Sequence, residues 1–71
     1  MVLFMGELPL AAVDRIIRKS SGLRVSNSAV IELARILEEE GMKISLKAKA
    51  LAEHAKRKTI TADDIRLAIR Q

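Results

Sequence analysis

Cysteine, tryptophan and tyrosine are absent from this 71-residue chain, and phenylalanine and histidine occur once each. Without cysteine, the chain can form neither a disulfide framework nor a thiolate metal site. Proteins that hold single strands of nucleic acid usually stack the bases on aromatic rings, and this chain has almost none to offer. We therefore exclude disulfide scaffolds, thiolate metal centres and base-stacking platforms.

The same scarcity argues against an enzyme. Most of the serines lie where caps and turns are predicted, and no glycines flank them as in a nucleophile elbow. His54 would have to share a metal with carboxylates, but the spacing of a metal motif is missing, as is a glycine-rich phosphate loop. We expect no catalytic activity, metal, cofactor or small-molecule substrate.

Almost half of the residues (49%) are apolar, and nearly all of these are aliphatic. A chain of this length forms one domain with a small core, and no covalent or metal staple supports it, so we expect oligomerisation to contribute stability. Thirteen Lys and Arg residues against nine Asp and Glu give a net charge of +4 and a pI near 10.0. This balance indicates attraction to polyanions.

The first residues, MVLF, are apolar but too few for a membrane span or a secretory signal, and no basic residue precedes them. We expect an intracellular protein without membrane contact, in which residues 1–6 are a poorly ordered extension and residues 7–71 form the domain. Two origins of residues 1–4 stay open: a native tail, or an extension ahead of a true start at Met5.

The segment that follows predicts a short first helix. Pro9 suits the first turn of a helix, because that turn does not need its N–H. The apolar positions then recur at helical spacing: Leu10, Val13, Ile16 and Ile17. The sequence SSG, at residues 20–22, ends the run with helix breakers and a glycine suited to a left-handed conformation.

The middle of the chain predicts one long helix, from Asn27 to about Ala55, without proline and with Gly41 as its only glycine. One stripe steps by threes and fours through Val30, Leu33, Leu37, Gly41, Ile44, Ala48, Leu51 and Ala55. Such a helix spans roughly 42 Å, whereas a compact monomer of this size has a diameter of roughly 30 Å. The stripe therefore predicts an obligate dimer, in which two copies cross near Gly41.

A short final helix is predicted after the sequence TADD. Thr61 is its expected N-cap, and the acidic residues at 63 and 64 suit the positive end of the helix dipole. Its apolar side comprises Ile65, Leu67, Ala68 and Ile69, and it stops at Gln71. Each connecting loop contains a stretch that could form a two-residue strand, within residues 23–25 and at residues 59–60.

Three consecutive glutamates, Glu38 to Glu40, fan over more than half the circumference of the long helix. We interpret them as a solvated face whose charges pair with Lys43 and Lys47, one or two turns further on. Because they would repel DNA, they mark a surface that points away from it.

The cations fall into two groups, each beside a predicted helix start. The first group is Arg15, Arg18, Lys19 and Arg24, and the second is Lys56, Arg57 and Lys58. Side-chain cations and free backbone N–H groups at a helix start together make a phosphate site. The hydroxyls that can add contacts are those of Ser26, Thr59 and Thr61. Nothing in this set reads bases, so we expect salt-sensitive binding to the backbone of double-stranded DNA.

Three stretches carry a resemblance to a known family: ELPLAAVDRIIRKSSGLRVS, LARILEEEG and LAEHAKRKTITADDIRLAIR. Over residues 7–70 the chain resembles archaeal-type histones, the minimal tail-less form of the all-α histone fold. The RKT turn followed by ADDI, with RVS earlier, is the most specific part. The resemblance implies an intertwined head-to-tail homodimer that compacts DNA in the cytoplasm, associated with the chromosome or nucleoid.

The resemblance also implies how the basic groups meet. In such dimers the first loop of one chain lies beside the second loop of the other, so residues 24–26 would join residues 57–59 of the second copy in one phosphate clamp. Arg15 would reach toward the minor groove or its flanking phosphates, with Arg18 and Lys19 in support. Arg57 and Asp64 match the family's internal ion pair, which braces the second loop.

Leu51, His54 and Asp64 match the family's contact between dimers, a small four-helix bundle across which His and Asp pair. The resemblance thus implies tetramers or longer assemblies that wrap DNA. Because imidazole changes charge between pH 5 and 8, we expect assembly to respond to pH.

The chain departs from the family's pattern in several places. Ala12 replaces a second proline, Ser21 and Gly22 alter the first loop, the basic end of some relatives is missing, and residues 1–6 are additional. Two alternatives stay open: a histone-fold module that pairs with another protein, and a dimer that bends DNA without wrapping it. The basic groups in both loops favour DNA binding over the first alternative.

Overall fold

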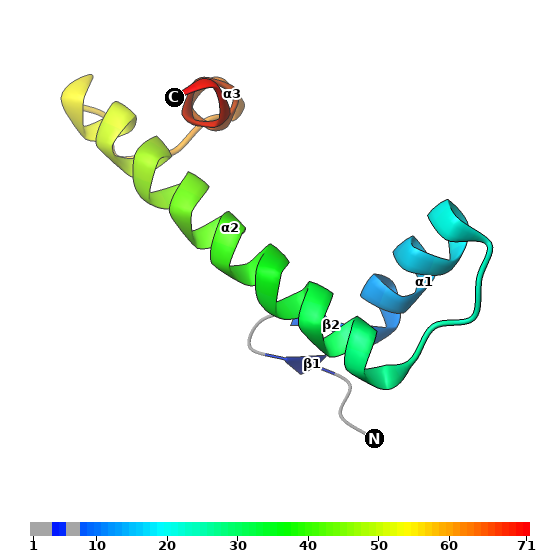
Figure 1. The fold of residues 1–71 in the computed structure, drawn as a ribbon. Coiled ribbons are helices and arrows are strands. Elements are labelled where there is room, and N and C mark those ends of the chain that lie inside the picture. The colour runs from blue at the N-terminus through cyan, green and yellow to red at the C-terminus, as the bar shows by residue number, and fades with distance from the viewer. Residues whose placement is uncertain (1–3, 6–7) are drawn as a thin grey trace. The chain divides into compact units, whose positions relative to one another are not determined.

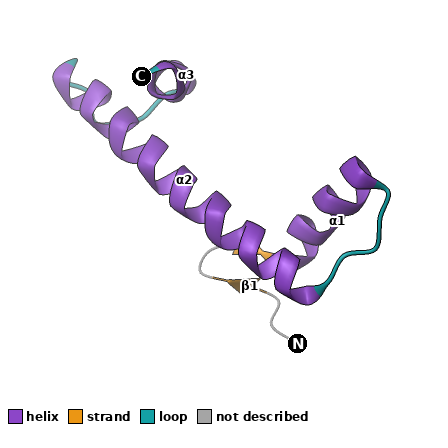
Figure 2. Cartoon of the chain, in the orientation of Figure 1, coloured by secondary structure: helices purple, strands orange, loops and turns teal. Residues whose placement is uncertain are grey.

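The computed structural model describes residues 4–5 and 8–71, and these form three helices and two very short strands (Figure 1). In chain order the elements are β1 (Phe4–Met5), β2 (Leu8–Pro9), α1 (Leu10–Ser21), α2 (Asn27–His54) and α3 (Ala62–Arg70). The predicted order of short, long and short helices is confirmed (Figure 2). The chain comprises two compact units, which divide within α2 between Glu39 and Glu40, and each is described by itself.

At the start of the first unit, β1 and β2 pair antiparallel, with Phe4 opposite Pro9 and Met5 opposite Leu8. Of the extension predicted to be poorly ordered, residues 1–3 and 6 lie outside the described residues. Pro9 precedes the first turn of α1 instead of lying within it: its φ of −75° and ψ of 119° are those of an extended N-cap residue. This backbone conformation follows from the pairing with β1, and α1 begins one residue later.

The core of the first unit lies between α1 and the N-terminal half of α2. Its buried residues are Leu10, Val13, Val30 and Ala34, and Leu8, Ile17, Val25 and Leu33 pack against them. The members on α1 recur at intervals of three and four, as one helix face requires. Ile16, predicted on the same side, is 55% exposed, because it is adjacent in sequence to Ile17 and so points about 100° away from it.

Side-chain and backbone caps fix both ends of the first loop. Gly22 adopts a left-handed conformation, with φ of 70°, and its N–H donates to the Arg18 carbonyl at 2.9 Å. At the start of α2 the Ala29 N–H donates to Ser26 Oγ at 3.1 Å, so Ser26 is the N-cap that the sequence predicts. Residues 20–22 therefore end α1 as expected.

In the second unit, the buried residues are Ala48 and Ala52 on α2 and Asp64 and Ala68 on α3. Three of these four are alanines, whose small side chains let two helix backbones approach closely. Lys47 Nζ donates to the Gln71 carbonyl at 3.1 Å, and not to a glutamate as predicted. Of the predicted acidic face, Glu39 accepts from Arg35 Nη1 at 2.8 Å and Glu40 from Lys43 Nζ at 3.5 Å.

The apolar stripe of α2 is covered at its ends but open at its middle. Val30 and Ala48 are buried, whereas Leu37 and Gly41 between them are exposed. Two neighbouring apolar residues are more exposed still, Met42 at 62% and Leu46 at 65%. Exposed large apolar side chains in such a row mark an interaction surface rather than a solvated face.

The C-terminus of α2 ends in a Schellman motif with an unusual residue in the left-handed position. The Arg57 N–H donates to the Ala52 carbonyl and the Lys56 N–H to the Glu53 carbonyl, both at 2.9 Å. Lys56 has φ of 60°, a conformation that glycine adopts far more readily than lysine does. The chain thus holds a lysine at a point where its backbone is strained.

Neither loop contains a strand within residues 22–26 or 55–61, so the two-residue strands predicted there do not form in the single chain. A strand requires hydrogen bonds from a neighbouring strand, and within the described part of this chain neither loop has one. No helix among the described residues is both long and apolar enough to cross a membrane.

The two left-handed caps give opposite predictions for substitution. Lys56→Gly should raise the free energy of unfolding by about 1 kcal/mol, because glycine relieves the left-handed strain. Gly22→Ala should lower it by about 1 kcal/mol for the converse reason, since open space around Gly22 leaves only the backbone conformation to oppose a side chain. Chemical denaturation at a fixed protein concentration measures both, and equal signs would contradict the assignment.

Candidate nucleic-acid interface

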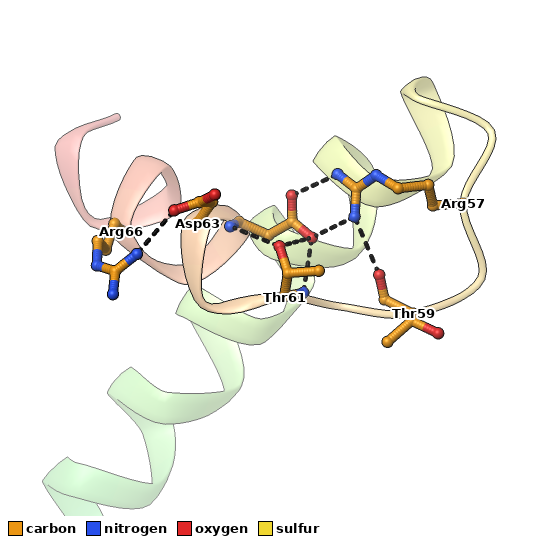
Figure 3. A network of polar contacts seen from close by, with 6 residues as sticks. Arg57, Thr59, Thr61, Asp63 and Arg66 are labelled. Atoms are coloured by element: carbon orange, nitrogen blue, oxygen red, sulfur yellow. Dashed lines mark hydrogen bonds and ion pairs between the residues drawn. The ribbon is translucent and has the colours of Figure 1, made fainter.

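The second loop is built around a two-pronged ion pair between Arg57 and Asp64. Arg57 Nη1 donates to Asp64 Oδ2 at 2.9 Å, and Arg57 Nη2 donates to Asp64 Oδ1 at 2.7 Å (Figure 3). Arg57 Nη1 also donates to the Thr59 carbonyl at 3.1 Å. One guanidinium thereby ties the beginning of the loop to its middle and to the first turn of α3.

Asp64 also forms three hydrogen bonds with Thr61. The Thr61 N–H and hydroxyl donate to Asp64 Oδ2 at 2.8 and 3.2 Å, and the Asp64 N–H donates to Thr61 Oγ1 at 3.4 Å. This reciprocal arrangement is a capping box, as the sequence TADD predicts. Asp64 is only 2% exposed, so a loop-bracing carboxylate is also a buried helix cap.

The network shifts the pKa values of both partners in the direction that favours charge. Hydrogen bonds from the Arg57 guanidinium, and then from the Thr61 backbone, hold the pKa of Asp64 far below its ordinary value, against the opposing effect of burial. Hydrogen bonding to Asp64 raises the pKa of Arg57. The pair is therefore fully charged throughout the physiological range.

The cations of the second loop line a hollow at the surface. Its lining comprises Lys49, Ala52, Glu53, Lys56, Arg57, Lys58 and Ile60. Four of these residues are cationic and only Glu53 is anionic, so the hollow has a positive potential. Lys49 did not belong to the predicted basic group, because it lies within α2, whereas Lys56 follows the end of that helix.

The first basic group is exposed along α1 and the first loop. Arg15, Lys19 and Arg24 are exposed, whereas Arg18 Nε donates to Asp14 Oδ1 at 2.8 Å, so part of its charge is balanced within its own helix. Ser26 Oγ accepts from the Ala29 N–H and lies 3.1 Å from Ser28 Oγ. The two basic groups belong to different units, and each has its own helix start beside it.

Three hydroxyls were predicted to contact phosphate, and two of them instead accept hydrogen bonds as helix caps. Those of Ser26 and Thr61 serve their own helices, whereas Thr59 engages the network through its carbonyl and leaves its side chain exposed. The short polar residues at these helix starts therefore act first as caps.

The three residues predicted at a contact between dimers differ in accessibility. His54 is exposed at the last position of α2, and Leu51 is half-buried one turn earlier. Asp64 is buried, and both of its carboxylate oxygens already accept hydrogen bonds within the chain. The neighbouring Asp63 is the exposed carboxylate at this helix start, where it pairs with Arg66 Nη1 at 2.7 Å. Across the described residues, no cluster of three or more potential ligands could hold a metal ion.

The acid sensitivity of the fold follows from the Asp64 network. Because the folded-state pKa is depressed, the network contributes its full stability above the ordinary carboxyl value of 3.8 and loses it as pH falls further toward the folded value. Unfolding free energy should therefore decrease with acidification below pH 3.8. Asp64→Asn should lower stability at neutral pH and flatten this acid dependence.

Equilibrium denaturation of both proteins between pH 2 and 7 tests this expectation. Asp63→Asn serves as the control, because it removes an exposed carboxylate of the same helix turn and should leave the acid dependence nearly unchanged. A parallel loss of stability with pH in the Asp64→Asn variant and the native protein would contradict the role of the network.

Comparison with known proteins agrees with this architecture. Residues 6–69 match the family described as "Histone-like transcription factor (CBF/NF-Y) and archaeal histone". The chain is 48% identical over 66 residues to a chain of the archaeal histone HAN1 from Thermococcus zilligii, covering 93% of this chain and 98% of that protein. It is 44% identical over 66 residues, with the same coverage, to "Probable archaeal histone 3" of Methanocaldococcus jannaschii. With its short, long and short helices, this chain has the all-α histone fold and belongs to the family of archaeal histones and histone-like transcription factors.

Proposed function

We propose that this protein binds double-stranded DNA without sequence specificity, through the phosphate backbone, and compacts it at the chromosome. The proposal rests on the cations of the second loop, Lys56, Arg57 and Lys58, which lie close to the start of α3. Asp64 braces this loop through its bonds to Arg57 and Thr61. Contacts between such cations and phosphate carry no information about base sequence. The proposal includes no catalytic step.

We further propose that the protein acts as a head-to-tail homodimer. The open middle of the α2 stripe supports this arrangement, because Leu37, Met42 and Leu46 are exposed in the single chain. A second copy crossing there would cover them and would bring residues 24–26 of one chain beside residues 57–59 of the other. The unpaired loops would then supply each other with a strand neighbour.

Assembly of dimers into tetramers or longer arrays is the next proposed step. Leu51 and His54 lie at the accessible end of α2, which suits a contact between dimers. Asp64 contributes there by holding the loop and the start of α3 in place, since its own carboxylate is already bonded. Wrapping of DNA requires this contact, whereas bending by a single dimer does not.

Pairing with a different protein is a second candidate, because the family description includes transcription factors. A second copy of the chain can cover the apolar stripe of α2, and both loops expose cations. These two features favour DNA binding by a homodimer. Duplex binding that depends on salt distinguishes the two functions, since a pure protein–protein module has no reason to release counterions from DNA.

A salt series on random-sequence duplex DNA tests the first proposal. The logarithm of the association constant should fall linearly with the logarithm of salt concentration. Lys58→Gln should make this slope shallower, by about 0.9 per chain. The control is Lys43→Gln, which removes one exposed cation that pairs with Glu40 on α2. The native protein's failure to bind, or binding that ignores salt, would refute the DNA-binding proposal.

Nuclease footprinting tests wrapping. The native protein should protect lengths that increase stepwise as dimers are added, whereas Leu51→Ala and His54→Ala should stop at the length protected by one dimer. Both variants should retain the affinity of that first step, because neither residue belongs to the basic loops. Footprints that extend as far as those of the native protein would contradict the proposed contact between dimers.

A further inference from the structure

The Arg57 side chain has more donors than its internal contacts use. Asp64 and Thr59 engage both N–H groups of Nη1 and one of Nη2. Arginine carries five N–H donors in a planar fork, so Nε and the second N–H of Nη2 are left over. No described residue of the chain accepts from them.

The two leftover donors lie on one edge of the guanidinium and point in parallel. Nη1 faces the Thr59 carbonyl, and the Nε–Nη2 edge lies on the other side of the group, away from Thr59 (Figure 3). A pair of parallel N–H donors matches two oxygens of one phosphate. The Arg57 side chain is 40% exposed, so solvent and ligands can approach it.

The orientation of this edge is fixed before any ligand arrives. Asp64 holds the adjoining Nη1–Nη2 edge of the guanidinium with two bonds and is itself bonded to Thr61, while the Thr59 carbonyl holds Nη1 and so opposes rotation. A donor that is already ordered loses little conformational entropy on binding. Arg57 is therefore both an internal brace and a prepared anion donor.

Lys49 opens onto the same hollow that Arg57 lines. It is exposed on α2, and no described residue pairs with it, so its ammonium is available to an outside anion. Lys56 and Lys58 add positive charge to the same hollow, where Glu53 is the only acidic lining residue. The lining thus combines the guanidinium of Arg57, which Asp64 holds in place, with the ammonium groups of three lysines.

We propose that the Nε–Nη2 edge of Arg57 and the ammonium of Lys49 together hold one phosphate of duplex DNA. This inference rests on the proposed DNA binding and adds Lys49 to the contact surface, along α2 and beyond the second loop. Arg57 supplies direction, because its fork fits two oxygens of one phosphate. Lys49 supplies charge from the helix side and replaces a condensed counterion on the DNA.

Lys49→Gln is the first test, with Lys43→Gln as its matched control. Both variants remove one exposed lysine from α2, but only Lys49 lines the hollow. In the salt series on duplex DNA, Lys49→Gln should reduce the slope by about 0.9 per chain, and Lys43→Gln should leave it unchanged. Equal slopes for the two variants would overturn the inference while leaving native DNA binding, and hence the proposed function, intact.

Arg57→Lys tests the fork itself, because lysine keeps the charge but lacks the second pair of donors. Duplex affinity should fall roughly tenfold, as for the loss of one charge-assisted hydrogen bond, while the salt slope stays near that of the native protein. Native affinity in a variant shown by thermal unfolding to be folded would overturn the role of the edge. If this variant fails to fold, the comparison of the two lysine variants still decides.

A second chain is the competing occupant of the hollow. In that case Lys49→Gln would change the oligomeric state of the protein and spare the salt slope, which would overturn the inference. Sedimentation of the Lys49→Gln and Lys43→Gln variants without DNA provides this measurement. Identical oligomeric states, together with a reduced slope for Lys49→Gln alone, support the phosphate assignment.

Discussion

The contact between Arg57 and Asp64 is the constraint on which the proposed DNA-binding loop depends. It joins the beginning of the second loop to its middle and to the first turn of α3 through one guanidinium and one buried carboxylate. Such a carboxylate would be costly to bury without partners, and three donors from Thr61 and Arg57 to Oδ2 compensate for its loss of water. Because the loop is braced internally, its cations can stay exposed without leaving the backbone loose.

Strain and exposure concentrate in the same region. Lys56 occupies a left-handed position in which glycine would be more stable, and the hollow beside it gathers four cations with one carboxylate. Strained backbone conformations cluster at functional sites, where the surrounding structure holds them in place. The open stretch of α2 around Leu37 and Met42 is a comparable feature of the proposed dimerisation surface, because a second copy would remove this apolar area from water.

Much of the fold follows from local rules that operate within a few residues. The bounds of α2, the cap at Ser26, the left-handed Gly22 and the capping box at Thr61 depend on hydrogen bonds between near neighbours, which a sequence pattern reveals. Predictions failed where a residue's environment comes from elsewhere in the chain. Lys47 bonds to the Gln71 carbonyl and not to a nearby glutamate, because α3 returns to its side of α2.

The sequence by itself determined the class of protein. The absence of cysteine, the scarcity of aromatic residues and the helical periodicity indicate a small all-α chain, and the RKT and ADDI motifs indicate the histone family. Tertiary structure alone decided how each polar group is used. Asp64 is buried with both carboxylate oxygens bonded, Arg57 keeps donors that no described residue engages, and Lys49 lines the basic hollow. The reason is geometric: donors and acceptors are directional, and only the folded chain fixes which of them point inward and which remain for a ligand.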